Sequence, residues 1–133
     1  MPETIAQRRL HAIALLVPDY DQAIDWYVGV MGFDLVEDTP LSPGKRWVLV
    51  SAGEGSNLLL AKASNDRQRA AIGDQAGGRV MMILHTDDFA RDQAYYEAHG
   101  AQFEEEPRHE PYGMVAVFRD IFGNRWDLIQ PSQ

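Results

Sequence analysis

An acidic side chain within an apolar strand is the first place where this chain could carry out chemistry. Asp127 lies in the segment VFRDIFGNRWDLIQ, which predicts a strand, a tight turn over residues 119–124 and a second strand. Along the second strand polar and apolar residues alternate, so one face is polar and the other packs. An acid beside apolar neighbours is expected to have a perturbed pKa, as functional acids often do. The alternative is a structural ion pair between Asp127 and Arg125 or Arg46.

His85 is the residue that we pair with Asp127 as a candidate general acid and base. It follows the apolar run VMMIL and lies on the same side of its strand as Met81 and Ile83. The competing interpretation is a histidine that only forms hydrogen bonds at the strand end, near Thr86 and Asp87.

A second group of candidates has side chains that suit a small organic ligand. Trp47, Tyr112 and Phe118 lie on or beside predicted strands, where flat rings can contact an apolar molecule, and Arg125 precedes Asp127 on the same face. Burial in the core would also explain the tryptophan. We therefore predict Trp47, Tyr112, Phe118 and Arg125 as ligand-binding residues.

The elements that must position these side chains follow one pattern twice. Residues 12–17 predict a buried strand, Asp19 caps a helix that Gly32 ends, and three strands follow before residue 62. Residues 63–78 are rich in Gly, Ser, Asn and Asp, as in a connection. A strand, a helix capped near Asp87 and Asp88 and ended by Gly100, and three more strands then follow. Both halves are β-α-β-β-β.

The two halves align at a single offset of 68 residues without a gap. The matched pairs are Asp19 with Asp87, Tyr27 with Tyr95, Gly32 with Gly100, Glu37 with Glu105, Pro43 with Pro111, Gly55 with Gly123 and Leu60 with Leu128. Because caps, helix ends and hairpin turns coincide, the pattern indicates an internal duplication. At this offset the residue that corresponds to Asp127 is Leu59.

Composition limits the classes of function. The 133 residues, 45% of them hydrophobic, suffice for one domain with its own core. The chain has no cysteine, so metal binding would depend on His, Asp and Glu, and a cytoplasmic location is expected. A net charge of −8 disfavours nucleic acid and anionic membranes as partners. Neither a signal peptide nor a membrane anchor is expected from the first residues.

A duplicated β-α-β-β-β unit of this size resembles the vicinal oxygen chelate superfamily, which includes glyoxalase I, extradiol dioxygenases and bleomycin-binding proteins. The segments that carry the resemblance are VPDYDQAIDWYVGVMGF and FRDIFGNRWDL. The resemblance implies an α+β fold in which two tandem βαβββ modules curl around a cavity, commonly completed by a second subunit. We expect one domain over residues 1–133, with modules at about 10–62 and 79–130 and a linker at about 63–78, and a homodimer.

Metal-using relatives place a His in each first strand and a Glu or His in each last strand. Here those positions fall on Ala12, on Val80 or Met81, on Leu59 and on Asp127, so a single ligand is in place and no cofactor is expected. His11 lies one residue away and would need a β-bulge to reach the site.

Two functions remain open. The first is binding of a small, apolar or aromatic molecule between the modules without the usual metal. The alternative is a metal-dependent glyoxalase-like lyase or isomerase, or a dioxygenase, in which Asp127 binds a divalent metal together with His85 or His11. A scaffold without a ligand is the third interpretation.

Overall fold

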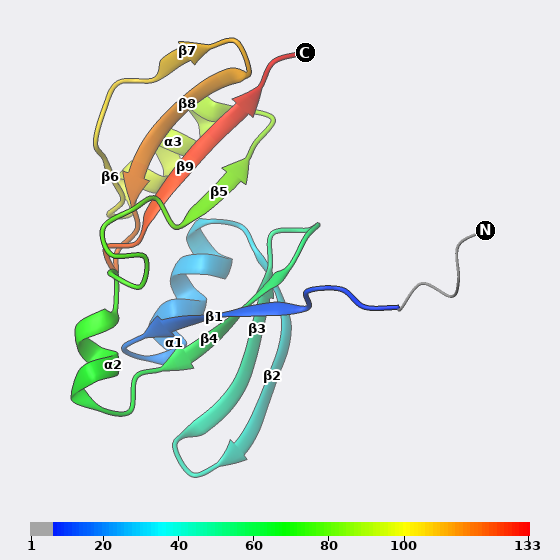
Figure 1. The fold of residues 1–133 in the computed structure, drawn as a ribbon, viewed down its shortest axis with the longest axis vertical. Helices are drawn as coiled ribbons and strands as arrows, with labels where there is room; N and C mark the ends of the chain where they lie inside the picture. Colours follow the sequence, from blue (N-terminus) through cyan, green and yellow to red (C-terminus); the bar gives the residue numbers. More distant parts are fainter. Residues whose placement is uncertain (1–6) are drawn as a thin grey trace.

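The computed structural model describes residues 7–133, and its elements form two β-α-β-β-β modules joined by a short connector (Figure 1). Module 1 contains β1 (Ala12–Val17), α1 (Tyr20–Ile24), the π-helix η1 (Asp25–Val30), β2 (Asp34–Ser42), β3 (Lys45–Ser51) and β4 (Asn57–Lys62). The connector contains α2 (Asp66–Ala71). Module 2 contains β5 (Met82–His85), α3 (Phe89–Ala98), β6 (Gln102–Phe103), β7 (Arg108–Glu110), β8 (Gly113–Arg119) and β9 (Arg125–Pro131). The two short strands β6 and β7 both pair with β8 and together take the place of β2 in module 1. The predicted α+β fold of two tandem βαβββ modules is confirmed.

Each module has one twisted sheet. Sheet 1 has the strand order β1-β4-β3-β2, and sheet 2 has the order β5-β9-β8-β6, with β7 also paired to β8. The first strand of each module runs parallel to the last one, and the other pairs are antiparallel. Because side chains alternate across a strand, each sheet has one face that packs under its helix and one that we call the helix-free face.

The hairpin at the end of module 2 forms as predicted, with β8 ending at Arg119 and β9 beginning at Arg125. Gly123 has a φ of 94°, which the turn requires, whereas no residue other than glycine has a positive φ in residues 7–133. Asn124, the other residue of this turn whose type tolerates a positive φ, does not adopt one. Asn124 is buried, and its amide contacts Asp120 instead.

The offset between the modules is not constant. Ala14 pairs with Leu59, and Ile83 pairs with Asp127, so the first strands are related by 69 residues and the last strands by 68. The helix caps confirm the larger offset, because Asp19 and Asp88 each accept a hydrogen bond from a backbone N–H at the start of the helix. The predicted match of Asp19 with Asp87 is wrong by one residue.

The π-helix η1 accommodates the extra residue of module 1. A π-bulge is a single turn of π-helix within an α-helix, and it accommodates one extra residue. Before η1 the offset is 69, and after it the buried pair Phe33 and Ala101 is related by 68. The buried partner of Tyr27 is consequently Tyr96, and not Tyr95, which is 47% exposed.

The connector is attached to both modules. The side chain of Gln75 accepts a hydrogen bond from Leu16 N (2.7 Å) and donates one to Ala14 O (3.2 Å), which covers the free edge of β1. Gly73 lies against the module 2 hairpin, where a Cβ atom would come within 2.2 Å of the carbonyl oxygen of Phe122. Glycine is therefore required for this close approach.

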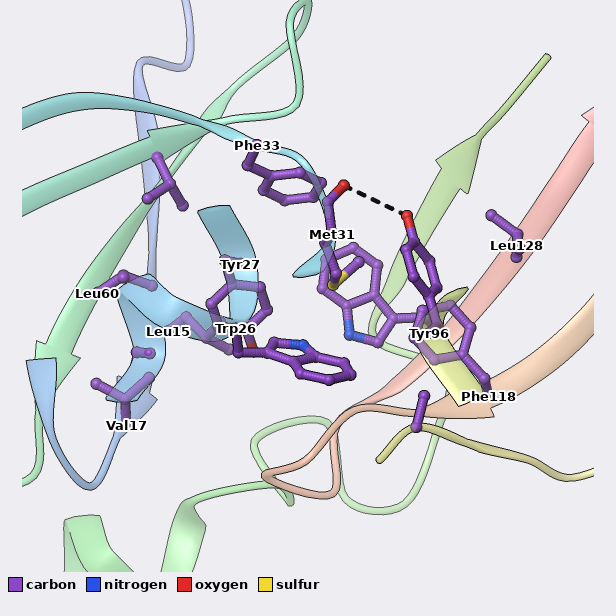
Figure 2. Close-up of a cluster of buried hydrophobic side chains, with 14 of the residues drawn as sticks. Leu15, Val17, Trp26, Tyr27, Met31, Phe33, Leu60, Tyr96, Phe118 and Leu128 are labelled. Atoms are coloured by element: carbon purple, nitrogen blue, oxygen red, sulfur yellow. Dashed lines mark hydrogen bonds between the residues drawn. The ribbon is translucent and has the colours of Figure 1, made fainter. Parts of the chain in front are cut away.

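The two modules share one hydrophobic core (Figure 2). It extends from Leu15, Val17 and Leu60 in module 1 to Phe118 and Leu128 in module 2. Aromatic rings join the halves: the centroids of Tyr27 and Trp126 are 6.2 Å apart, and those of Phe33 and Trp126 are 6.1 Å apart. Within residues 7–133 the helices are all far too short to span a bilayer.

Candidate functional site

Asp127 lies on the helix-free face of sheet 2, between Ile83 of β5 and Val117 of β8. Burial raises the pKa of its carboxyl group, Glu105 also raises it, and Arg108 and Arg125 lower it. No hydrogen bond or ion pair to Asp127 occurs in residues 7–133, so the structural ion pairs with Arg125 or Arg46 do not form.

His85 lies on the same face of β5 as Ile83, beside Ile129 of β9. It is therefore on the same face of sheet 2 as Asp127, one side-chain step further along the neighbouring strand. Within the described part of the chain no hydrogen bond joins the two side chains. The structure brings these two candidates to one surface, and their role as an acid and base pair stays a prediction.

Arg125 is held by other groups. Its guanidinium donates to both carboxylate oxygens of Glu104, at 2.9 Å each, and to Gly78 O at 2.7 Å. Arg119 also pairs with Glu104 at 2.9 Å. Arg125 thus ties the connector and β9 to the β6–β7 segment, and its predicted contact with a ligand would require it to leave a bidentate ion pair.

Two of the three predicted aromatic residues, Phe118 and Tyr112, line neither the cavity over sheet 1 nor the one between the modules. Phe118 is 0% exposed and packs on the helix side of sheet 2 against Tyr96, Phe103 and Trp126. The expectation that it lines a ligand cavity is corrected, because Phe118 and Asp127 are on opposite faces of the sheet. Tyr112 is 52% exposed in the turn between β7 and β8.

Trp47 does line a cavity. This cavity has a volume of about 560 Å³ and lies over the helix-free face of sheet 1. Its floor is made by Leu16, Leu59 and Ala61, which share that face through the pairing of β1 with β4. Leu41 forms a further apolar wall. In module 1 the helix-free face thus forms an apolar pocket, whereas in module 2 the helix-free face carries Asp127.

A polar rim surrounds this pocket. Arg46 is fixed by Asp21 (2.9 Å) and Asp38 (2.7 Å), and its guanidinium carbon lies 5.2 Å from the centroid of the Tyr20 ring. Lys45 and Gln68 lie at the same rim. Because Arg46 is paired twice, Lys45 and Lys62, which also lines the pocket, are the cations of this lining that are left to meet an acidic group of a ligand.

His11 does not reach either helix-free face. It has the parity of Ile13 and Leu15, and the ladder between β1 and β4 runs from Ala12 to Val17 without the bulge that could redirect it. In residues 7–133 no three His, Asp or Glu side chains are close enough to share a metal ion. The 69-residue offset also makes Met81, and not Val80, the counterpart of Ala12.

The sequence reasoning missed a buried polar cluster that joins the modules. Asp120 is 4% exposed and accepts hydrogen bonds from the Tyr27 hydroxyl (2.6 Å), Trp126 Nε1 (3.0 Å) and Asn124 Nδ2 (3.1 Å). Its other oxygen accepts from the backbone N–H groups of Phe122 and Asn124. Burial, followed by Asp120, raises the pKa of Tyr27 well above its usual value. The signal in the sequence was an acid immediately before a hairpin turn, a position that favours hydrogen bonds to turn N–H groups.

Comparisons with known proteins agree on one family. The model of the Glyoxalase/Bleomycin resistance protein/Dioxygenase superfamily matches residues 9–128. An uncharacterized protein of Shewanella frigidimarina (strain NCIMB 400) is 52% identical over 121 residues, which are 89% of this chain and 90% of the relative.

Two solved structures are similar as well. The antibiotic binding protein TnmS3 from Streptomyces sp. CB03234 has 28% identity and a TM-score of 0.72, covering 97% of this chain and 100% of its own. A superfamily member from Sphaerobacter thermophilus DSM 20745 has 26% identity and a TM-score of 0.72, covering 93% and 98%.

Proposed function

The chain belongs to the Glyoxalase/Bleomycin resistance protein/Dioxygenase superfamily, and on this premise we propose that it binds a small apolar or aromatic molecule against Trp47, without a metal. The observation that carries the proposal is the pocket of about 560 Å³ on the helix-free face of sheet 1. A volume of this size with an aromatic wall and a few polar groups is typical of ligand sites. The similarity to an antibiotic binding protein supports a small-molecule ligand.

The walls of the pocket define the ligand that it accepts. Leu16, Leu59 and Ala61 offer a flat apolar floor, and the indole of Trp47 stands at its side. A ring system can lie on this floor and bury its edge against Trp47, which removes apolar area from water. At the rim, Lys45 favours a ligand that carries a carbonyl or an acidic group at one end.

The donor groups do not fit the metal centre of the metal-using relatives. The two first-strand positions hold Ala12 and Met81, and the two last-strand positions hold Leu59 and Asp127. One carboxylate is too few for a divalent transition metal ion, which normally needs three or four protein ligands. We therefore propose that binding is independent of metal. Dialysis against EDTA, followed by addition of Ni²⁺, Zn²⁺ or Fe²⁺, should leave ligand affinity unchanged within twofold.

Ligand binding can be measured through the fluorescence of Trp47. Trp26 and Trp126 are each 2% exposed, whereas Trp47 is partly exposed at the pocket, so a quencher or ligand there acts on one indole. We expect 1-anilinonaphthalene-8-sulfonate, and then members of a panel of aromatic antibiotics, to quench this fluorescence saturably.

Leu59→Asp is the variant that tests the pocket, because it places a carboxylate in the apolar floor. It should weaken binding of the naphthalene probe about tenfold or more, since the charge must be desolvated by the ligand. Val36→Ala is the matched control, because Val36 is an apolar residue of the same module, 51% exposed, outside the pocket. Equal affinity of both variants and the wild type would contradict the proposal.

We also propose that two copies of the chain associate. Three of the large apolar side chains that the structure leaves exposed, Leu41, Ile83 and Tyr112 at 52%, 65% and 52%, would be removed from water by a second copy of the chain. Light scattering coupled to gel filtration should give twice the chain mass of 15.0 kDa. A mass of one chain at micromolar concentration would contradict this. The cytoplasmic location and the lack of a nucleic-acid partner stay predictions from composition.

A further inference from the structure

A second cavity, of about 740 Å³, lies where the two modules meet, and it shares no residue with the pocket at Trp47. One wall is the end of η1 and the segment up to Phe33, and the opposite wall is α3 from Arg91 to Ala98. The last residues of β5 and the loop to Asp88 close the polar end. This module-junction cavity therefore exists only because the modules pack against each other.

Aromatic and apolar groups form the inner part of the module-junction cavity. Phe33 and Met31 lie on one side and Tyr96 on the other, and the hydroxyl of Tyr96 points to the carbonyl of Met31 at 3.4 Å (Figure 2). Tyr95 stands at the rim, 47% exposed, with its ring centroid 4.3 Å from that of His99. Rings on several sides favour a flat, unsaturated ligand.

The polar end of the cavity has an excess of negative charge. Asp87 and Asp92 both lie there, and Arg91 is the one cation of the lining, paired with Asp87 at 2.9 Å and with Asp92 at 3.0 Å. The Thr86 hydroxyl also donates to Asp92. His85 forms no hydrogen bond or ion pair within residues 7–133. With a neutral imidazole the formal sum of these groups is one negative charge.

The helix formed by α1 and η1, on the opposite wall of the cavity, adds to this negative charge. The continuous helix of α1 and η1 ends at Val30, and its C-terminal residues line the cavity. The C-terminal end of a helix carries a partial negative charge because its last carbonyl groups lack helical partners. Tyrosine and phenylalanine faces also attract cations. The aromatic walls, the carboxylates and the helix end therefore favour the same kind of ligand.

We propose that the module-junction cavity is a second binding site, which takes a planar aromatic molecule that carries a protonated amine. The ring packs on the lining beside Ala94 and Tyr95, above the contact between Tyr96 and Met31, and the ammonium or ring N–H⁺ group meets Asp92 and Asp87. This site does not depend on the proposed function of the Trp47 pocket, whose floor is apolar and whose rim carries Lys45.

Two probes with the same ring count separate charge from shape. The full-length chain is titrated at pH 8 with the cation 9-aminoacridine and with the anion anthracene-9-carboxylate. Binding is followed by probe anisotropy and by equilibrium dialysis. We expect one saturable site for the cation per chain and about tenfold weaker binding of the anion, with the cation losing affinity as salt rises. Equal affinity for both probes, or no saturation by the cation, would overturn the proposal.

Matched variants locate the site. Ala94 is an exposed residue of α3 that lines the cavity, and Ala90, one turn earlier, is exposed and outside it. Ala94→Phe fills the cavity and should abolish binding of 9-aminoacridine, whereas Ala90→Phe and Trp47→Leu should leave it within twofold. Asp87→Asn should weaken it about threefold, because Asp87 is largely exposed. Loss of binding in Trp47→Leu with retention in Ala94→Phe would place the cation in the other pocket and overturn the proposal.

Discussion

On sheet 1, Leu59 lies between Ala14 and Leu49, whereas on sheet 2 the corresponding Asp127 lies between Ile83 and Val117. The backbone pairing is the same, and the chemistry of the two faces differs. The face in module 1 is an apolar pocket with Trp47, and the face in module 2 has an acid near Arg108 and Glu105. The same backbone position in the two modules can therefore hold side chains of different chemistry. In module 1 it contributes to an apolar floor, and in module 2 it carries a charge.

The hairpin turns that follow β3 and β8 differ in a similar way. In module 2, Asp120 and Asn124 are buried and bind Tyr27 of module 1. At the 68-residue offset the module 1 turn has Ala52 and Ser56 instead, and Ser56 only donates to Leu10 O at 2.7 Å. In this contact between the modules, module 2 thus supplies the side chains of Asp120 and Asn124, and module 1 supplies the hydroxyl of Tyr27.

The largest expected effect comes from removing the acid of the module 2 turn. Asp120→Ala leaves the hydroxyl of Tyr27 and the N–H of Trp126 buried without an acceptor, so it should lower the free energy of unfolding by about 3–5 kcal/mol. Ser56→Ala, the control in module 1, should cost less than about 1 kcal/mol. Urea unfolding measures both, and equal losses would show that the two turns are equivalent.

The second-largest expected effect on stability comes from the contact between the connector and the module 2 turn. Gly73 has a φ of 76° and touches the Phe122 carbonyl, so Gly73→Ala should destabilise the protein by about 2–4 kcal/mol. Gly29 in η1 has free space around it, and Gly29→Ala should stabilise by up to about 1 kcal/mol. Thermal and urea unfolding of the two variants should therefore change in opposite directions.

Deletion of one residue tests the role of η1. Without Gly29 the π-helix can become a regular α-helix like α3, so the variant should fold and lose no more than about 2 kcal/mol of stability. Deletion of Ala94 from α3 has no bulge to absorb it and would turn Tyr96 away from the core, since each residue rotates a helix by about 100°. Circular dichroism and near-ultraviolet spectra should show a native fold for the first deletion only.

The smallest effect concerns Asp127 and depends on pH. Because burial raises the pKa of this carboxyl group, its ionised form disfavours the folded state, and wild-type stability falls relative to Asp127→Asn as the pH rises above the usual range of an aspartate. The gain of the Asn variant at pH 7 should stay below about 1 kcal/mol, since the site is partly exposed. Leu59→Asn should instead lose stability by an amount that does not change between pH 3 and 7. A pH-independent difference for Asp127→Asn would contradict the assignment.

Local patterns explain why much of the fold could be predicted. Asp19 before a helical run, Gly32 and Gly100 after one, and Gly123 in a hairpin act within a few residues, so their effect is visible in the sequence. The repeat of these signals identified the two modules. The offset failed by one residue in the first strands, because a π-helix and an α-helix bury the same kinds of residue and differ by a single position.

The site residues were harder to predict, because a side chain's role depends on which face of the sheet it occupies. Phe118 on β8 pairs with Trp126, the residue before Asp127 on β9. Phe118 nevertheless lies under α3, whereas Asp127 lies on the helix-free face. Trp47 could be placed at a cavity from its strand alone. Arg125 could not be placed in this way, because its hydrogen-bond partners are Glu104 and Gly78, which come from two other segments.

By itself the sequence determined the two β-α-β-β-β modules and the asymmetry between Leu59 and Asp127, because these depend on residue type and local order. Only the tertiary structure decided that Asp120 is a buried joint between the modules, that Gln75 covers the edge of β1, and that α3 and η1 enclose a second cavity. Those features arise from contacts between segments about 60 to 90 residues apart. Only the packing of the two modules determines which of these segments meet.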